Sequence, residues 1–356
     1  MMRLDDREWK DFAVPDIFQN IQRGKRLKNA DHIPGIVPYV SSTANNNGVD
    51  DYIEASEGTR VFKNCISLAN SGSVGTAFYE PFAFVASDHV TSLECKEANG
   101  YIYLFLTAVL EQQGSNFNFN REINDLRIKK MRVMLPVTYE GKPDFKFMED
   151  YIRELMTEKK KQYLGYVKKR IMELYAAHDD QQVDWKSMID SHEWEPFKID
   201  TIFNILPGKR LVAADSTPGD RPFIGALDNS NGVARFVSNK NESLDKNVLG
   251  VNYNGNGMVI GFYHPYECIF SDDVKRFHLK DREDNPFVLL FMKTAILMQK
   301  QKFGYLYKFN ADRMAHTSIM LPVTDSGQPD YDFMESFGRK MMLSKYNQYL
   351  AYIDKE

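Results

Sequence analysis

The sequence has few cysteines, no recognisable metal-ligand spacing and no apolar run long enough to span a membrane. Its three cysteines, Cys65, Cys95 and Cys268, form no CxxC pair, and its seven histidines form no HxH or HExxH pattern. Neither a disulfide framework nor a structural zinc site is indicated. Apolar stretches such as YIYLFLTAVL stop well short of the roughly 20 residues of a membrane span, and MMRLDDREWK has no signal-peptide core. We therefore expect a cytoplasmic protein with no membrane contact.

The chain also lacks an excess of positive charge. Its 45 Lys and Arg residues stand against 49 Asp and Glu residues, which gives a net charge of -4. This balance argues against a protein that coats nucleic acid indiscriminately, because such affinity comes from phosphate neutralisation. It is compatible with a specific binder whose basic groups are local. The length of 356 residues predicts two domains, each able to bury its own core.

What the sequence does contain is one unit of about 180 residues, present twice. WKDFAVPDIFQNIQRGKRL from Trp9 returns as WEPFKIDTIFNILPGKRL from Trp194. GIVPYVSSTANNNGV matches GDRPFIGALDNSNGV, and AFYEPFAFVASDHV matches GFYHPYECIFSDDV. Near the end of each copy, LPVTYEGKPDFKFME from Leu135 matches LPVTDSGQPDYDFME from Leu321. Repetition over such a span indicates a duplicated structural unit.

Each repeat is predicted to begin with a mainly β globular part. In residues 9–140 and 194–325, Gly, Pro and Asn interrupt short apolar runs such as CISLAN and MRVMLPV. That pattern is typical of short strands joined by loops. One helix is expected in each globular part, over GYIYLFLTAVLEQQ and PFVLLFMKTAILMQK.

A long helix is predicted to follow each globular part. From Phe147 to about Tyr175, apolar residues recur at three- and four-residue spacing without a proline, and the counterpart starts at Phe333. Asp144 and Asp330 stand where an N-cap belongs, so LPVT ends a strand and FME begins a helix. The fold class is therefore α+β, with two mainly β domains each followed by a long helix.

Two stretches resemble the sequence motifs of catalytic sites. Pro143 and Asp144, followed by Glu158 to Lys160, resemble the PD…ExK ligands of metal-dependent nucleases, but the second copy has Ser344, Lys345 and Tyr346 instead. DNPF at 284–287 resembles an adenine-methyltransferase motif with a proline missing, and it opens a predicted helix where Asp and Pro are ordinary residues. We expect both to be structural.

Two further motifs are equally weak as catalytic sites. GNGMVIG from Gly255 is a loose glycine fingerprint whose repeat partner precedes no helix, so a tight turn or bulge is expected. His89 lies beside Asp88, but we expect no Ser or Cys nucleophile to be paired with it. The chain is therefore expected to be non-catalytic.

Polar loops that differ between the copies are the candidate DNA-binding segments. Arg and Lys contact phosphates or guanine, and Asn and Ser read base edges. Each loop also has an ordinary explanation: a solvated charge cluster, an Asn-Gly turn, or alternate packing in a strand. The runs Lys159–Lys161 and Lys168–Arg170 indicate only the solvated face of a helix. The candidates are Arg23, Lys25, Arg26, Lys28, Ser41, Ser42, Thr43, Asn45, Asn46, Asn70, Asn118, Asn120 and Arg121 in the first repeat, and Lys209, Arg210, Asp228, Asn229, Ser230, Asn254, Tyr305, Tyr307 and Lys308 in the second.

These paired motifs resemble the DNA-specificity subunits of Type I restriction-modification systems and the similar subunits of BcgI-like Type IIB systems. The resemblance covers essentially the whole chain in both halves. It implies target recognition domains at 1–145 and 179–330, and spacer helices at 146–178 and 331–356 that pack antiparallel. Each domain is expected to bind one half of a bipartite site in double-stranded DNA.

The resemblance also implies partners that do the chemistry. DNA adenine methyltransferase subunits would supply S-adenosylmethionine and Mg²⁺ and flip the target adenine, and in a Type I complex a restriction/translocase subunit would add ATP-driven cleavage. No cofactor is expected in this chain. Type I and Type IIB remain alternatives, as do two other classes: a free-standing DNA-binding protein such as a repressor, and an orphan nuclease using Asp144 and Lys160.

Overall fold

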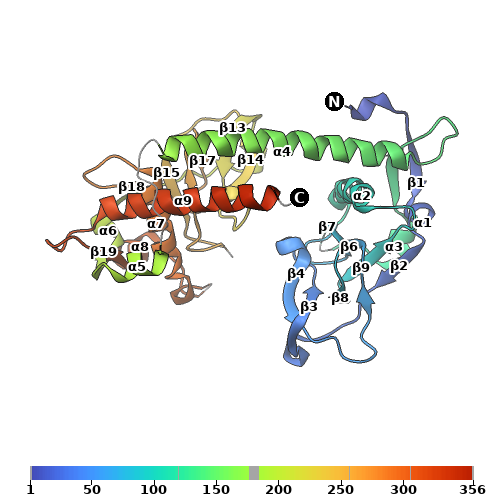
Figure 1. Cartoon of the computed structure of the whole chain (residues 1–356), viewed down its shortest axis with the longest axis horizontal. Helices are drawn as coiled ribbons and strands as arrows, with labels where there is room; N and C mark the ends of the chain where they lie inside the picture. Colours follow the sequence, from blue (N-terminus) through green and yellow to red (C-terminus); the bar gives the residue numbers. More distant parts are fainter. Residues whose placement is uncertain (1, 119, 176–183, 256, 305, 355–356) are drawn as a thin grey trace. The chain divides into compact units, whose positions relative to one another are not determined.

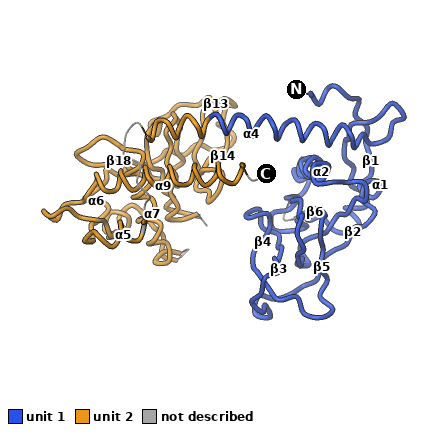
Figure 2. The backbone as a smooth tube through the Cα atoms, viewed as in Figure 1, with its two compact units in different colours: residues 1–165 blue, residues 166–356 orange. Residues whose placement is uncertain are grey.

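The computed structural model describes residues 2–118, 120–175, 184–255, 257–304 and 306–354 (Figure 1). The chain divides into two compact units, residues 1–165 and 166–356 (Figure 2). Each unit holds one globular part of the repeat. Helix α4 (Phe145–Tyr175) begins in the first unit and ends in the second.

Unit 1 contains three sheets in its described residues. A two-stranded sheet pairs β1 (Trp9–Ala13) with β10 (Arg132–Pro136). An antiparallel sheet has the order β2 (Asn20–Arg23), β9 (Val90–Glu94), β6 (Cys65–Ala69), β7 (Ala77–Glu80). A mixed sheet has the order β4 (Val49–Ile53), β3 (Pro34–Val40), β8 (Phe84–Ala86), β5 (Val61–Phe62), in which β3 and β8 run parallel.

Helix α2 (Gly100–Gln113) covers the antiparallel sheet of unit 1. Asn99 caps it by accepting hydrogen bonds from the amides of Tyr101 and Ile102. Its buried face packs with strand residues such as Ile66 and Leu93, both 0% exposed. Full burial of one such side chain stabilises a fold by about 1.5–3 kcal/mol. Two short helices, α1 (Val14–Ile17) and α3 (Asp125–Lys130), complete the same core.

Unit 2 repeats this arrangement strand for strand, apart from one edge strand. β11 (Trp194–Lys198) pairs with β19 (Ser318–Pro322). The antiparallel sheet has the order β12 (Phe203–Pro207), β18 (Val274–Leu279), β15 (Val248–Asn252), β16 (Gly261–His264). The mixed sheet contains β14 (Val233–Val237), β13 (Pro218–Ile224) and β17 (Ile269–Phe270). Its helices are α5 (Trp185–Asp190), α6 (Ile199–Ile202), α7 (Pro286–Leu297) and α8 (Ala311–His316).

Both strand-to-helix junctions have the predicted structure. β10 and β19 end at the proline of LPVT, and the long helices α4 and α9 (Tyr331–Ile353) follow. Asp144 accepts a hydrogen bond from the Phe147 amide at 2.9 Å, and Asp330 accepts one from the Phe333 amide at 2.9 Å. The N-cap predictions are therefore confirmed.

Within unit 2, the last turns of α4 lie alongside α9 and run in the opposite direction (Figure 1). The Tyr166 and Tyr346 hydroxyls are 3.4 Å apart, and Val167 and Leu174 are buried. α9 also packs on α7, where the rings of Phe291 and Phe337 are 5.6 Å apart. The expected antiparallel packing of the two long helices is seen in this part of the chain.

None of the described helices has the length and apolar character needed to cross a membrane. All three cysteines are buried free thiols. Burial raises the pKa of Cys65 to about 11 and that of Cys268 to about 12. These thiols are therefore protonated and act as small apolar core groups.

Candidate nucleic-acid interface

The β3–β4 and β13–β14 hairpins end in turns of the same unusual conformation. Three successive residues, 46–48 in unit 1 and 230–232 in unit 2, have φ values between 48° and 75°. Asn, Ser and Gly tolerate this left-handed region better than other residues. The turns close with hydrogen bonds from the Gly48 amide to Asn45 O and from the Gly232 amide to Asn229 O, both at 2.8 Å. The Asn-Gly composition therefore has a backbone reason, and it leaves the side chains of these turns exposed.

In unit 1, three loops distant in sequence meet beside the hairpin turn. The Ser73 amide donates to Ser42 O at 3.0 Å, which joins the hairpin loop 41–47 to the loop 70–76. A Cβ on Gly75 would lie 2.4 Å from the Cα of Gly114, so the 114–121 loop also meets this point. We call these three segments, together with the turn at residues 86–89, the loop cluster of unit 1.

The basic segment 23–28 borders this cluster. Arg23 Nε donates to Asp88 O, and the Lys25 amide donates to Ala86 O at 3.1 Å. Arg60 donates a hydrogen bond to Arg23 O. The side chains of Lys25, Arg26 and Lys28 are exposed. Exposed basic side chains on an anchored backbone are suited to phosphate contacts.

Asn70 has a structural position in this conformation, contrary to the expectation that it contacts a base. It is 1% exposed, and its Oδ1 accepts a hydrogen bond from the Thr91 hydroxyl at 3.0 Å. Its Nδ2 is buried without a hydrogen-bond partner among the described residues. The side chain holds the 70–76 loop against β9 and does not reach the surface.

His89 does have a serine partner, which corrects the sequence-based expectation. Ser71 Oγ and His89 Nδ1 are hydrogen-bonded, while Asp88 lies 3.9 Å from the other ring nitrogen, too far for a hydrogen bond. In unit 2 the same connection is made by Asn254 Nδ2 and Asp273 Oδ1 at 3.0 Å. Since an amide and a carboxylate replace the pair there, the contact closes a loop and is not a catalytic dyad.

Unit 2 forms an equivalent loop cluster from residues 225–231, 252–255, 257–260, 271–273, 298–304 and 306–309. Asn252, which is 1% exposed, donates from Nδ2 to Leu227 O at 2.7 Å and to Gly257 O at 3.1 Å. Asn231 Nδ2 donates a hydrogen bond to the Tyr266 hydroxyl at 3.0 Å. The Phe309 amide donates to Met258 Sδ at 3.2 Å, which joins the segment after β15 to the segment after α7.

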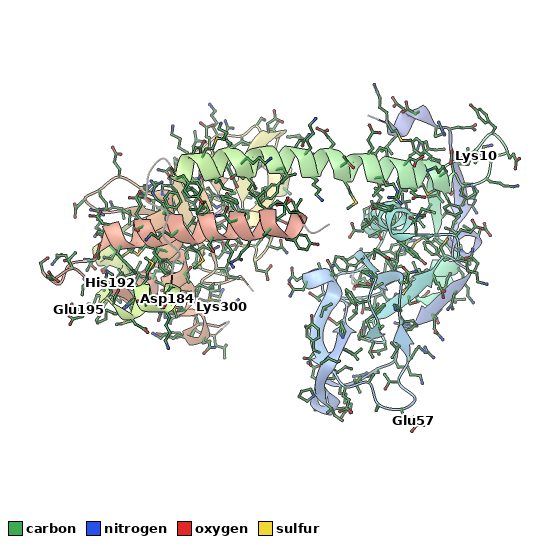
Figure 3. All side chains as sticks on the ribbon, viewed as in Figure 1. Lys10, Glu57, Asp184, His192, Glu195 and Lys300 are labelled. Carbon is green, nitrogen blue, oxygen red and sulfur yellow. The ribbon has the colours of Figure 1, made fainter. Side chains whose placement is uncertain are left out.

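A pocket of about 590 Å³ opens within this second cluster. Its lining combines two lysines and an amide with an aromatic ring and a thioether: Asn254, Gly255, Met258, Lys300, Phe303, Gly304 and Lys308. Lys300 is labelled at the edge of unit 2 in Figure 3.

Val259, next to Met258, has a φ of 71° although it is β-branched, whereas Gly75 has a φ of 86° at the matching position of unit 1. Strain of this kind persists only where the surroundings impose it.

Several basic groups of unit 2 are already paired with acids. Lys209 Nζ lies 3.2 Å from Glu242, and Arg210 lies 3.7 Å from Asp272. Burial lowers the pKa of Lys275, against the opposing effect of Asp272 and Asp273, and its Nζ lies 5.0 Å from the ring centre of Tyr253. The 298–314 segment, by contrast, contains four basic residues and a single acid.

The catalytic motifs have structural roles. Asp144 caps α4 and pairs with Arg7 at 3.0 Å, and Glu158 lies 14 residues further along the sequence, roughly 20 Å away at 1.5 Å rise per residue. Asn285 caps α7, and Asp284 accepts hydrogen bonds from the Leu279 amide at 2.8 Å and from His278. Gly255 has a φ of 73° in the turn after β15. In the described part of the chain, no three His, Cys, Asp or Glu side chains form a group able to hold a metal ion.

The remaining predicted residues fall into three groups. Ser41, Ser42, Thr43, Asn254 and Lys308 are half-buried within the clusters, and Tyr305 lies outside the described residues. The exposed candidates at the loops are Asn45, Asn46, Asn118, Asn120, Arg121, Asp228, Asn229, Ser230 and Tyr307.

The sequence prediction did not include Lys300, Arg60 or Arg313. A comparison of charge between the two repeats would have found Lys300 and Arg313.

Comparison with known proteins gives a consistent result. The family model described as "Type I restriction modification DNA specificity domain" matches residues 6–164 and 191–349. The specificity subunit S.BcgI of a Type II restriction enzyme from Heyndrickxia coagulans is 36% identical over 338 residues, which cover 94% of each chain. Two solved structures are also similar. The S subunit of a Type I system from M. genitalium has a TM-score of 0.43 and 14% identity, covering 99% of this chain and 94% of the other. The HsdS subunit from Thermoanaerobacter tengcongensis has a TM-score of 0.33 and 10% identity, covering 98% and 91%.

Proposed function

Since this chain belongs to the Type I restriction-modification DNA specificity family, we propose that it is the DNA-recognition subunit of a restriction-modification complex. Each repeat binds one half of a bipartite site in double-stranded DNA. The chain itself is non-catalytic, and partner subunits carry out methylation and cleavage. The proposed target recognition domains are residues 1–145 and 179–330, and the proposed spacers are 146–178 and 331–356.

The observation that carries this proposal is the pair of loop clusters on one repeated frame. β1–β10 and β11–β19 have the same register, and the hairpin turns have the same backbone conformation. The loop side chains differ: Ser41, Ser42 and Thr43 in unit 1 are replaced by Gly225, Ala226 and Leu227 in unit 2. A shared frame with unequal polar loops fits a protein that reads two different short sequences.

The partners follow from the same assignment. We propose that DNA adenine methyltransferase subunits dock on the spacer helices and supply S-adenosylmethionine and Mg²⁺. In a Type I complex, a restriction/translocase subunit adds ATP-driven cleavage. A free-standing repressor would need none of these, and the identity to S.BcgI over 94% of the chain favours the specificity subunit. Co-purification with a methyltransferase distinguishes the two functions.

The spacer helices provide the direct test. Insertion of four residues into both α4 and α9 lengthens each by about 6 Å. We expect methylome sequencing of a host that carries the complete system to yield a bipartite motif with a longer gap and unchanged half-sites.

The matched control exchanges the hairpin loops 41–47 for 225–231 without changing the helices. This change should alter one half-site and leave the gap unchanged. A changed half-site after the helix insertion, or an unmethylated host in the presence of the wild-type chain and its methyltransferase, would contradict the proposal.

A further inference from the structure

Leu306 is held outside the protein surface at the tip of a tight turn. Its side chain is 95% exposed. Gly304 and Tyr307 close the turn with two backbone hydrogen bonds, of 3.2 and 3.0 Å. Single exposed leucines are common on protein surfaces and need no explanation, so the surroundings of the turn decide what this one can do.

The turn is anchored rigidly to the core of unit 2. Tyr307 stacks on Phe303 with ring centres 5.7 Å apart and planes inclined by 10°. Phe303 contacts Phe309, which is 0% exposed, at a ring distance of 4.6 Å. The guanidinium of Arg313 covers the Tyr307 ring at 3.8 Å. Aromatic and cation–π contacts of this kind fix the Tyr307 end of the turn, next to Leu306.

Basic side chains surround this apolar tip. Residues 298–314 contain Lys300, Lys302, Lys308 and Arg313 against the single acid Asp312. Lys300 and Lys308 line the pocket beside the turn. An apolar tip with a basic border has the composition of proteins that unstack DNA, in which Leu, Met or Phe enters a base step while cations hold the flanking phosphates.

The equivalent turn of unit 1 has different chemistry. Asn118 and Arg121 form the same bridge that Gly304 and Tyr307 form in unit 2, so Asn120 stands at the position of Leu306. Residues 112–128 balance Arg121 and Arg127 against Glu122 and Asp125. A polar tip without net charge suits contact with base edges and offers nothing to insert.

We propose that Leu306 is an apolar wedge that enters the base stack of duplex DNA within the half-site bound by unit 2. Lys300 and Lys308 neutralise phosphates next to the opened step. Unit 1 reads its half-site without a wedge. This inference rests on the proposed function and adds to it a recognition mode that depends on how easily one base step is unstacked.

The test uses the full-length chain co-purified with its methyltransferase subunit and duplexes that carry the bipartite motif obtained by methylome sequencing. Each duplex has one 2-aminopurine, placed at successive positions other than the methylated adenines. We expect a several-fold rise in fluorescence at one step of the unit 2 half-site. Leu306→Ala should abolish this rise and weaken binding about tenfold, whereas Leu306→Met should retain it. Leu126→Ala is the matched variant, because it removes another leucine that is 72% exposed but lies outside the loop clusters, and it should leave the signal unchanged.

Three results would overturn the inference. Leu306→Ala with wild-type fluorescence and affinity would leave the wedge without a role. Leu306→Ala that binds the duplex normally but loses the methyltransferase subunit would assign this tip to a protein contact. A wild-type complex that binds the motif without a fluorescence rise at any step would refute the wedge alone, whereas a complex that does not bind the motif at all would refute the proposed function as well.

Discussion

At the same position of their antiparallel sheets, the two units bury different titratable side chains. Glu80 stands opposite Cys65 in the strand register of unit 1, and His264 stands opposite Val248 in that of unit 2. The side chains of Glu80 and His264 are both 0% exposed. Burial raises the pKa of Glu80 to about 7, against a hydrogen bond from Ser67, and lowers the pKa of His264 to about 4. An acid and a base are interchangeable here because burial favours the neutral form of either.

A second difference lies on the neighbouring strands. In unit 2, Asp245 accepts hydrogen bonds from Arg276 at 2.8 Å and from His278 at 2.9 Å. By sheet register, Ser92 and Glu94 of unit 1 stand where Arg276 and His278 stand in unit 2. The hydrogen bonds that His278 donates to Asp245 and Asp284 raise its pKa to about 9. The frame therefore preserves strand pairing while the polar contacts that stabilise each copy differ.

The largest expected effect follows from breaking the network that only unit 2 has. Asp245→Ala leaves Arg276, which is 8% exposed, without its carboxylate. We expect the free energy of unfolding of unit 2 to fall by about 3–5 kcal/mol. Hydrogen exchange should show faster exchange in β15 and β18 with unchanged protection in β6 and β9. Glu94→Ala is the control, with an expected loss of about 0.5 kcal/mol or less; equal losses from the two variants would refute the asymmetry.

The two buried groups predict opposite pH responses in the two units. Unfolded Glu80 ionises above pH 4.5, but the folded group stays protonated up to about pH 7, so unit 1 loses stability as pH rises through this window. Unfolded His264 gains a proton below pH 6.5, but the folded group does so only near pH 4, so unit 2 loses stability as pH falls through that window. Each effect is about 3 kcal/mol. Because the stabilisation from His278 is lost only as pH rises from 6.5 through about 9, it does not overlap the His264 window.

Matched glutamine variants test this contrast. Hydrogen exchange between pH 4 and 7 measures the stability of each unit separately. Glu80→Gln should remove its contribution to the slope in unit 1 only, and His264→Gln should do so in unit 2 only. A variant that changes the slope of both units, or of neither, would contradict the assignment to these buried groups.

The smallest expected effect concerns the two helix caps. Asp144 combines its cap with the Arg7 ion pair, whereas the second carboxylate oxygen of Asp330 lies 3.7 Å from His192 Nε2. Asp330→Ala should cost about 1 kcal/mol of unfolding free energy, and Asp144→Ala up to about 2 kcal/mol, both measurable by denaturant unfolding. Asp144→Asn should keep the cap and recover most of the loss. Any DNA cleavage by the complex should survive Asp144→Asn; loss of cleavage at normal stability would favour the nuclease alternative.

Local sequence was sufficient for the frame. The proline of LPVT ends β10 and β19, and Asp144 and Asp330 cap the following helices, because a cap depends only on amides within one turn. The hairpin turns were equally legible, since Asn-Gly reports a left-handed backbone. The long helix α4 follows from its own apolar spacing.

The functional surface was less legible because it depends on contacts across sequence. Asn70 and Asn45 have the same side chain, but Asn70 is buried against strand β9, whereas Asn45 is exposed in a hairpin turn. Ser71 meets His89 only because β6 and β9 are paired. Charge composition alone does not reveal that Lys300 and Lys308 line one pocket with Asn254.

The sequence by itself determined that this protein is a duplicated α+β frame with two unequal sets of polar loops, because repetition, caps and turns are written in short stretches. Only the tertiary structure decided which of those polar groups are buried and hydrogen-bonded within a unit and which are exposed together at a surface. The physical reason is that burial and hydrogen bonding are settled by strands and loops that are distant in the chain. The tertiary structure also decided that Asn120 and Leu306 occupy equivalent turns, so that this turn is polar in unit 1 and apolar in unit 2.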